Sequence, residues 1–371
     1  MHEHRFVFGG LPSRVVFGAG SLQDLGQEVE SLGATRALVL ATPNQEALAQ
    51  DVSLRLGSRS VGVYAQAIMH VPIDSVTRAL EEVRRCGADC LLAAGGGSTI
   101  GLAKAIALES GLPIVAIPTT YAGSEMTSIY GITEAARKRT GKDARVLPRT
   151  VIYDVNLTLS LPVSVSVTSA MNAVAHAAEG LYAQHSNPVI SMMAEQGIEA
   201  IARAIPALYR DPLDVGARSF AQYGAWLCGT VLGNVGMALH HKLCHVLGGS
   251  FNLPHAEVHS VVLPHALAFN SNAAPSSMEQ IADSLGVSYA PAGMFDLATR
   301  HGAPSGLKDI GMRESDLDLA ADLVVSQPYW NPRPVGVGQR DEIRTLLQHA
   351  FNGVRPEAMA EGFAPGRGGS A

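Results

Sequence analysis

Residues 90–99 read Cys-Leu-Leu-Ala-Ala-Gly-Gly-Gly-Ser-Thr, a strand-to-helix pattern from which the architecture of the N-terminal half can be predicted. The apolar run at 90–94 is typical of a buried strand, and it stops at three glycines before the helical spacing of residues 100–110 begins. Without a Cβ, a glycine backbone can approach a pyrophosphate, and the N–H groups that open the following helix point at it. The hydroxyls of Ser98 and Thr99 add donors. The G-x-G-x-x-G spacing of the common dinucleotide fingerprint is absent, so these residues alone predict either a nucleotide-binding turn or simply a tight turn.

Strand-like and helix-like segments alternate on both sides of this turn. Short apolar runs predict further strands at residues 37–41, 60–64, 113–118 and 151–154, and helical spacing predicts helices at residues 46–57 and 74–86. We expect Asp74 or Ser75 to cap the second of these helices. Alternation of this kind predicts a parallel sheet with helices on both of its faces, which is a Rossmann-like arrangement.

The pattern changes near residue 160. The last strand signal ends at Asp154, and from Ser169 onward the spacing predicts long helices at residues 169–184, 189–209 and 215–240. We therefore predict an α/β N-terminal domain over residues 1–161, followed by an all-α C-terminal domain over residues 162–371.

The composition excludes several classes of protein. Of the 371 residues, 47% are apolar and 16% are charged, which is enough to build large cores and unlike a disordered chain. The net charge of −6 and the 5% of aromatic residues argue against nucleic acid as a partner. Four cysteines are too few for a disulfide scaffold. Residues 1–5 carry no apolar signal core, and the uncharged stretch 224–239 is too short to cross a bilayer, so we expect a cytoplasmic protein with no membrane partner.

A second loop that is rich in hydroxyls follows the strand predicted at 113–118. It reads Pro-Thr-Thr-Tyr-Ala-Gly-Ser-Glu over residues 118–125. One interpretation is an ordinary solvated loop. The other is a loop that lines the cofactor site through Thr119, Thr120 and Ser124, because ligands favour the carboxyl ends of strands in open α/β sheets.

Histidines are concentrated in one short region. Six of the thirteen lie between residues 240 and 265, a window of 26 of the 371 residues in which random placement would put about one. His241 and His245 share a helical face, and Asn172 and His176 share another. Three interpretations stay open: a divalent metal site formed by Asn172, His176, His241 and His255, a metal-free acid–base site, or core histidines bonded to the backbone.

Motifs along nearly the whole chain resemble those of the iron-containing (group III) alcohol dehydrogenases. They are Arg14-Val15-Val16-Phe17-Gly18, Gly95-Gly96-Gly97-Ser98, Pro118-Thr119-Thr120, His176, His241-x3-His245-x-Leu247-Gly248, Pro254-His255 and Leu263-Pro264-His265. Shorter strings resemble the maleylacetate reductases within that family: Met69-His70-Val71-Pro72, residues 148–154, residues 255–259 and Asn331-Pro332-Arg333-Pro334-Val335. The resemblance implies a dehydroquinate synthase-like architecture, an active site in the cleft between the two domains, and a homodimer.

The resemblance also implies an activity, the NADH- or NADPH-dependent reduction of the dicarboxylate maleylacetate to 3-oxoadipate in the bacterial breakdown of aromatic compounds. His245 matches the family's histidine near the nicotinamide and is the candidate acid. His176, His241 and His255 would donate hydrogen bonds to the substrate's oxygens. Lys242 and Arg333 either bind the carboxylates of the substrate or are surface charges.

One departure from the family pattern concerns the metal. The metal-dependent relatives carry Asp where this chain has Asn172, so the only anionic ligand of the set is lost and divalent affinity should fall sharply. A conjugated alkene can accept hydride and form an enolate, for which a hydrogen-bond donor and a proton source suffice. We therefore expect that no metal is required, and a weakened metal site is the other possibility.

Cofactor choice rests on Thr42-Pro43-Asn44, because NAD-selective relatives often place Asp at the position of Pro43. We expect both NADH and NADPH to be accepted. The predicted cofactor contacts are Gly95, Gly96, Gly97, Ser98, Thr99, Thr119, Thr120, Ser124, Thr42 and Asn44. The alternatives are a metal-dependent alcohol or aldehyde dehydrogenase of the same family, a lyase that uses NAD without net turnover, and a nucleotide-binding module without activity.

Overall fold

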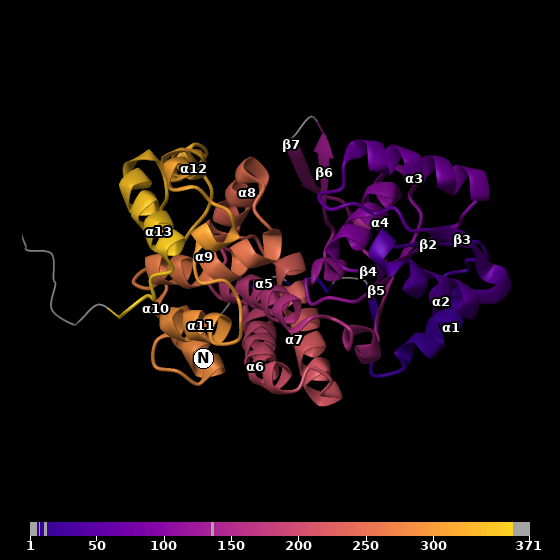
Figure 1. The fold of residues 1–371 in the computed structure, drawn as a ribbon, viewed down its shortest axis with the longest axis horizontal. Coiled ribbons are helices and arrows are strands. Elements are labelled where there is room, and N and C mark those ends of the chain that lie inside the picture. Colours follow the sequence, from indigo (N-terminus) through magenta and orange to yellow (C-terminus); the bar gives the residue numbers. More distant parts are fainter. Residues whose placement is uncertain (1–5, 7, 11–12, 135–136, 359–371) are drawn as a thin grey trace, which may run out of the picture.

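The computed structural model describes residues 6, 8–10, 13–134 and 137–358, and it shows two lobes side by side (Figure 1). The N-terminal lobe holds an open sheet, and the C-terminal lobe is built of helices, as predicted. Our prediction about residues 1–5 lies outside the described residues. The domain boundary at residues 161 and 162 stays a prediction, although every strand of the described chain ends before it.

Six parallel strands form the sheet in the order β1-β8-β5-β4-β2-β3. In the middle of the sheet, Leu92 of β4 pairs with Val39 of β2 and with Val115 of β5, and all three are fully buried. Such continuous apolar runs are expected where helices cover both faces. The bounds are Arg14–Phe17 (β1), Ala37–Leu40 (β2), Ser60–Tyr64 (β3), Cys90–Gly95 (β4), Ile114–Pro118 (β5) and Thr150–Tyr153 (β8).

Helices α1 (Leu25–Ser31) and α2 (Glu46–Leu56) cover one face of the sheet, and α3 (Ile73–Cys86) and α4 (Gly97–Ser110) cover the other (Figure 1). Helix α4 begins three residues earlier than predicted, so the glycine turn itself opens it. The prediction that Asp74 or Ser75 caps α3 is wrong. Pro72, in an extended conformation, precedes the helix without a side-chain cap, and the buried Ser75 hydroxyl has no hydrogen-bond partner among the described residues.

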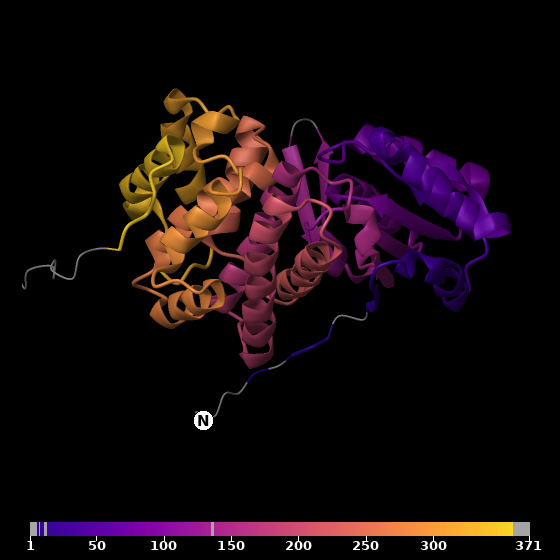
Figure 2. The same ribbon diagram turned by 60° about the horizontal axis from the view of Figure 1, so that its bottom comes forward.

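An antiparallel hairpin of β6 (Ile129–Glu134) and β7 (Arg137–Lys142) was not predicted, and it stands between the two lobes (Figures 1 and 2). Its second strand is rich in lysine and arginine and lacks the apolar alternation by which we recognise strands. Ile132 anchors the hairpin in the apolar cluster under α3 and α4.

The C-terminal lobe packs around α5, in which every residue from Ser166 to Leu181 is buried. Its helices are α5 (Val163–Leu181), α6 (Pro188–Arg210), α7 (Val215–Asn234), α8 (Leu239–Phe251), α9 (His255–Asn270), α10 (Pro275–Leu285), α11 (Ala290–Thr299), α12 (Leu317–Val325) and α13 (Arg340–Asn352). The prediction of one helix over 215–240 is wrong, because Val235 is extended and the chain restarts as α8. Within the described chain, no helix is long and apolar enough to cross a membrane.

Arg218 of α7 joins the segments where the two lobes meet. Its fully buried guanidinium donates to the Ser166 hydroxyl (2.7 Å), the Tyr121 hydroxyl (3.2 Å) and the carbonyl oxygens of Leu161 and Pro212 (2.9 Å each). Each of these oxygens would lose the hydrogen bond that the guanidinium donates if the guanidinium were removed.

We expect Arg218→Met to lower the free energy of unfolding by about 3 kcal/mol, because buried acceptors are left unpaired. Urea unfolding followed by far-UV circular dichroism measures the change. The exposed Arg203, which stacks on Phe220 with 4.1 Å between its Cζ and the ring centroid, supplies the control Arg203→Met. Equal midpoints for the two variants would show that the Arg218 contacts add nothing.

Candidate active site

Three loops meet at the carboxyl edge of the sheet. Gln45, after β2, donates from Nε2 to the Thr119 hydroxyl after β5 at 2.7 Å, and Thr42 lies 3.4 Å from Gln45 Oε1. The backbone N–H of Thr119 donates to the Gly95 carbonyl at 3.3 Å. The chain leaves β2 toward β3 and leaves β4 toward β5, on opposite sides, so the β2–β4 boundary is a topological switch point. Ligands of open α/β sheets bind at such a point.

Different constraints favour glycine at the three positions of the turn. A Cβ on Gly95, whose φ is +156°, would lie 2.4 Å from the Thr99 hydroxyl oxygen, and a Cβ on Gly96 would lie 2.9 Å from a methyl carbon of Thr120. Gly97 opens α4, and no atom within 4 Å would meet its Cβ. The protein's own packing therefore explains Gly95 and Gly96, whereas the open space at Gly97 leaves room for an anionic ligand on the helix N-terminus.

The other predicted cofactor residues lie near this turn in different environments. Thr99 is fully buried beneath Gly95, so its hydroxyl lies under the turn and not on its open side. Asn44 is exposed, and Ser98, Thr120 and Ser124 are half-buried. The carbonyl of Ser124 accepts a hydrogen bond from the buried Lys104 Nζ at 2.7 Å, which ties this loop to α4.

Three helices bring the histidines together. Helix α5 carries Asn172 and His176, α8 carries His240, His241 and His245, and α9 carries His255 and His259. His176, His240, His241 and His259 are buried, whereas His245 and His255 are exposed. The ring centroids of His241 and His245 are 6.4 Å apart, and those of His255 and His259 are 4.5 Å apart. Two exposed rings therefore lie next to a buried layer of four.

A chain of hydrogen bonds runs through the buried layer. Glu179 Oε2 accepts from His241 Nδ1 at 2.7 Å, His241 Nε2 lies 2.8 Å from His176 Nδ1, and His176 Nε2 lies 3.2 Å from the carbonyl oxygen of Ala122. All three bonds form only if the two rings share three protons, one more than two neutral imidazoles carry. The pair then holds one positive charge, and the Glu179 carboxylate balances it.

Burial decides where that charge lies. It lowers the pKa of His176 well below its ordinary value, and the neighbouring His241 lowers it further. His176 is therefore the neutral Nε2–H tautomer, and the hydrogen-bond geometry places protons on both nitrogens of His241, of which Nδ1 contacts Glu179. Burial likewise lowers the pKa values of His240 and His259, so both rings are neutral.

Glu179 is the functional residue that we missed in the sequence. It is fully buried, and it accepts from the backbone N–H groups of Ala238 (2.8 Å) and His240 (2.7 Å), which places a carboxylate on the N-terminus of α8. These bonds form at the break between α7 and α8, which the sequence spacing failed to predict. A signal was present, because Glu179 is the only acidic residue of α5 and lies on the face of Asn172 and His176.

The structure gives the two predicted carboxylate-binding cations local partners. Lys242 Nζ lies 5.7 Å from the ring centroid of Tyr329. Arg333 stacks on Phe269 at 4.2 Å and forms an ion pair with Glu342 of α13. Arg333 therefore already has a carboxylate partner, and a role for either cation in substrate binding stays a prediction.

Asn331, in the same proline-rich motif as Arg333, contributes more directly to the site. Its Oδ1 accepts from the backbone N–H of Leu239 at 3.2 Å and from Asn270 Nδ2 at 3.1 Å. Asn331 thus holds the first residue of α8, and with it the start of the histidine helix.

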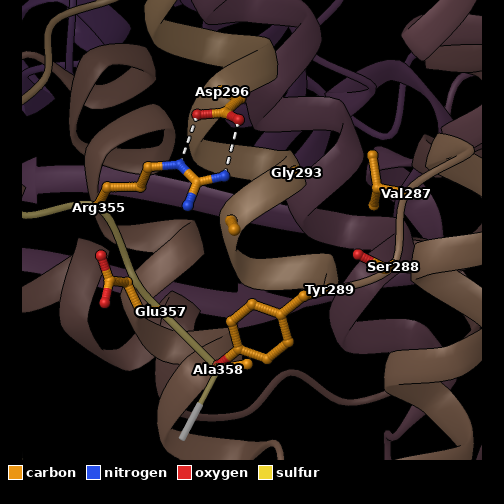
Figure 3. Close-up of a pocket in the computed structure, with 9 residues that line it drawn as sticks. Val287, Ser288, Tyr289, Gly293, Asp296, Arg355, Glu357 and Ala358 are labelled. Atoms are coloured by element: carbon orange, nitrogen blue, oxygen red, sulfur yellow. Dashed lines mark hydrogen bonds and ion pairs between the residues drawn. The ribbon is translucent and has the colours of Figure 1, made fainter. Parts of the chain in front are cut away.

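A separate pocket of about 470 Å³ lies on the C-terminal lobe (Figure 3). Arg355 crosses it to bind Asp296, with Nε and Oδ1 2.8 Å apart. None of its lining residues belongs to the glycine turn or to the histidine cluster: Val287, Ser288, Tyr289, Ala292, Gly293, Asp296, Arg355, Glu357 and Ala358. We therefore do not place the active site there.

The loop after β5 connects the two halves of the candidate site. Thr119 contacts the glycine turn, and three residues later the Ala122 carbonyl contacts His176. The backbone N–H of Tyr121 donates to the Ser169 hydroxyl of α5 at 2.9 Å, which attaches the loop to the helical lobe. A ligand on the glycine turn would therefore lie next to the histidine cluster.

Comparisons with known proteins match this arrangement. The chain matches the family described as iron-containing alcohol dehydrogenase over residues 12–155, and the C-terminal part of the Fe-containing alcohol dehydrogenase family over residues 166–351. A maleylacetate reductase from Burkholderia cepacia is 61% identical over 351 residues, which are 95% of this chain and 99% of that protein. The crystal structure of a putative alcohol dehydrogenase from Ralstonia eutropha JMP134 has 63% identity and a TM-score of 0.94 over 96% of this chain and 100% of that one. The maleylacetate reductase from Agrobacterium tumefaciens has 52% identity and a TM-score of 0.91 over 95% and 100%.

Proposed function

The chain belongs to the iron-containing alcohol dehydrogenase family, and we propose that within it this oxidoreductase reduces the C=C bond of maleylacetate with NADH or NADPH to give 3-oxoadipate. The observation that carries the proposal is 61% identity to a maleylacetate reductase over nearly the full length of both chains. The geometry supports it, because the nucleotide turn and the histidine cluster share the loop that starts at Thr119. The implied pathway is the bacterial breakdown of aromatic compounds.

The histidines suit the proton chemistry that this reduction requires. When bound, the nicotinamide supplies a hydride to the alkene carbon β to the ketone. The electron pair of the alkene then moves onto the ketone oxygen as an enolate, and a proton delivered to the α carbon completes the reduction. A donor that faces the ketone oxygen stabilises the enolate. His245, exposed beside the charged His241, is the residue we assign to proton delivery.

The family name implies iron, and the residues at the corresponding position fit a divalent cation poorly. Asn172 replaces the carboxylate ligand, so the set of Asn172, His176, His241 and His255 offers no anionic ligand. The hydrogen bonds of His176 and His241 place one positive charge on this pair, which opposes the binding of a second cation there. The buried Asn172 Oδ1 has no hydrogen-bond partner among the described residues, and it remains available to a substrate. Metal-free turnover is part of our proposal.

Chelation followed by assay tests the function. After prolonged treatment with a chelator, we expect maleylacetate to be consumed with one NADH oxidised per 3-oxoadipate formed, at the rate of the untreated enzyme. The matched variant Asn172→Asp restores an anionic ligand, so it should bind Fe²⁺ or Zn²⁺ more tightly than the parent. We expect NADH and NADPH to give kcat/KM values within about a hundredfold of each other, since Pro43 cannot bind a ribose hydroxyl.

Each alternative function predicts a different result. Loss of activity on chelation, with recovery on adding Fe²⁺, would support the metal-dependent alcohol or aldehyde dehydrogenase. Constant NADH absorbance while the substrate disappears would support the lyase. The predicted homodimer and the binding of the dicarboxylate by Lys242 or Arg333 are further parts of the proposal.

Gly97 allows a test of the cofactor site that does not disturb the fold. A Cβ at this position meets no protein atom within 4 Å, so Gly97→Ala should unfold at the same temperature as the parent. The added methyl group would crowd a pyrophosphate on the N-terminus of α4, and we expect the Kd for NADH to rise at least about tenfold. Fluorescence titration measures the Kd. An unchanged Kd would place the pyrophosphate elsewhere.

A further inference from the structure

A second group of ligand atoms lies behind the histidines of the candidate active site. His240 and Cys244 are one turn apart on α8, and His259 faces them from α9. His240 Nε2 lies 2.9 Å from His259 Nδ1 and 3.5 Å from Cys244 Sγ, and the three ligand atoms all lie within 4.8 Å of one another. The three residues are between 0% and 1% exposed.

Packing alone does not explain this polar group. Cys244 lies inside an apolar cluster with Leu243, Leu247 and Val258, where an apolar side chain would cost less to bury. The outer nitrogens of the pair, His240 Nδ1 and His259 Nε2, are buried and find no hydrogen-bond partner within the described chain. The inner nitrogens, His240 Nε2 and His259 Nδ1, instead face each other and the Cys244 sulfur, so three ligand atoms converge in one place.

We propose that His240, Cys244 and His259 bind a soft, thiophilic d¹⁰ cation, Zn²⁺ or Cu⁺, at a site separate from the Asn172 position. A thiolate with two imidazoles is the donor set that such cations prefer. Bonds of about 2.0 Å to nitrogen and about 2.3 Å to sulfur at tetrahedral angles place these two atoms about 3.5 Å apart. The observed nitrogen–sulfur distance of 3.5 Å matches this separation, and the two nitrogens at 2.9 Å need to part by only a fraction of an ångström.

Proton and charge balance are consistent with such a cation. On binding, the Cys244 thiol releases its proton to solvent, and the proton shared between His240 Nε2 and His259 Nδ1 moves to an outer ring nitrogen. The sulfur and one lone pair from each imidazole then bond to the metal, with no electron transferred. Cu⁺ with one thiolate is neutral. Zn²⁺ leaves one positive charge next to Glu179, which accepts from the backbone N–H of His240 at 2.7 Å. Because Glu179 already balances the His176–His241 pair, Zn²⁺ binding would release the extra proton of that pair to solvent.

A metal at this position would act on the active site through its neighbours. It would link α8 to α9, and both helices carry residues of the candidate active site. The His259 ring packs 4.5 Å from that of the exposed His255, and the His240 ring packs 5.2 Å from that of His241. The site is therefore one through which a thiophilic metal can modulate the histidine cluster without contacting the substrate.

Cobalt titration tests the divalent form, because Co²⁺ bound to a thiolate shows a near-ultraviolet charge-transfer band that Co²⁺ bound to imidazoles and an amide lacks. The full-length protein is first treated with chelator and thiol reductant. We expect the band in the parent, its loss in Cys244→Ser, and its retention in Cys228→Ser, a fully buried cysteine of α7 that serves as the matched control. If Cys244→Ser does not fold, His259→Gln replaces it. We expect His259→Gln to raise the Kd for Co²⁺ at least tenfold.

A competition experiment tests the monovalent form. Cu⁺ is offered anaerobically as a coloured chelator complex, and we expect the parent and Cys228→Ser to withdraw it while Cys244→Ser does not. A positive result in either the cobalt titration or the Cu⁺ competition supports the site and identifies the cation. The proposal is overturned if the parent shows neither the band nor Cu⁺ withdrawal, or if both responses survive in Cys244→Ser. These readouts do not depend on maleylacetate turnover, so their outcome is independent of whether the proposed function is correct.

Discussion

His245→Ala is expected to lower kcat for maleylacetate reduction about 1,000-fold, because the variant loses the group that delivers the proton. His245 is the exposed ring of α8, next to His241, whereas the other two histidines of that helix are buried. The substrate must reach the acid, and a buried ring cannot deliver a proton to it without a rearrangement. Steady-state rates of NADH oxidation measure the effect.

Two further measurements separate proton delivery from a structural effect at His245. The Kd for NADH should stay within about threefold of the parent value, and added imidazole should restore part of the rate. His301→Ala is the matched control, because this histidine lies just after α11, far from the candidate site in sequence, with its Nδ1 2.8 Å from the Leu297 carbonyl oxygen and its ring packed on Tyr209. A His245→Ala variant that keeps more than a tenth of the parent kcat would assign the proton to another residue.

Local patterns predicted five of the six strands, because short apolar runs in the sheet differ from helical spacing. The edge strand β1 was missed, and its residues are only partly buried. The apolar run at 90–94 and the glycines that follow it predicted β4. The parallel topology predicted that a ligand binds at the carboxyl ends of the strands. The hairpin of β6 and β7 was missed because its basic strand carries no apolar alternation. The break after Asn234 was missed because its cause lies on another helix, where Glu179 accepts the N–H groups that open α8.

The same limit applies to the site. The spacing of His241 and His245 on one helix can be read directly from the sequence, and so can that of Asn172 and His176. The contacts of Glu179 with α8, of Asn331 with Leu239 and of Gln45 with Thr119 join residues that are 59 to 92 positions apart. No local pattern encodes such contacts, so the sequence predicted the groups of the site and not the residues that hold them in place.

Glu179→Gln is expected to lower kcat about 100-fold, because the carboxylate both orients His241 and balances its charge. Glutamine has nearly the same shape, but its amide presents one oxygen where the carboxylate presents two, and its NH₂ group would face a donor. The four donors around Glu179 are the backbone N–H groups of Ala238, His240 and His241 and the Nδ1–H of His241. We also expect the free energy of unfolding to fall by about 2 kcal/mol, since at least one buried donor is left unpaired.

The decisive readout for Glu179 is the protonation of His241, because a purely structural role would leave it unchanged. Nitrogen NMR of labelled histidine should show one imidazolium in the buried pair of the parent at neutral pH and two neutral rings in Glu179→Gln, since the third shared proton has lost its balancing charge. Glu199→Gln, an exposed position on α6 whose carboxylate accepts from Gln196 at 3.1 Å, is the matched control and should keep both kcat and the NMR pattern. If Glu179→Gln loses stability but keeps the imidazolium and the rate, then Glu179 serves as the cap of α8 alone and the charge on His241 has another origin.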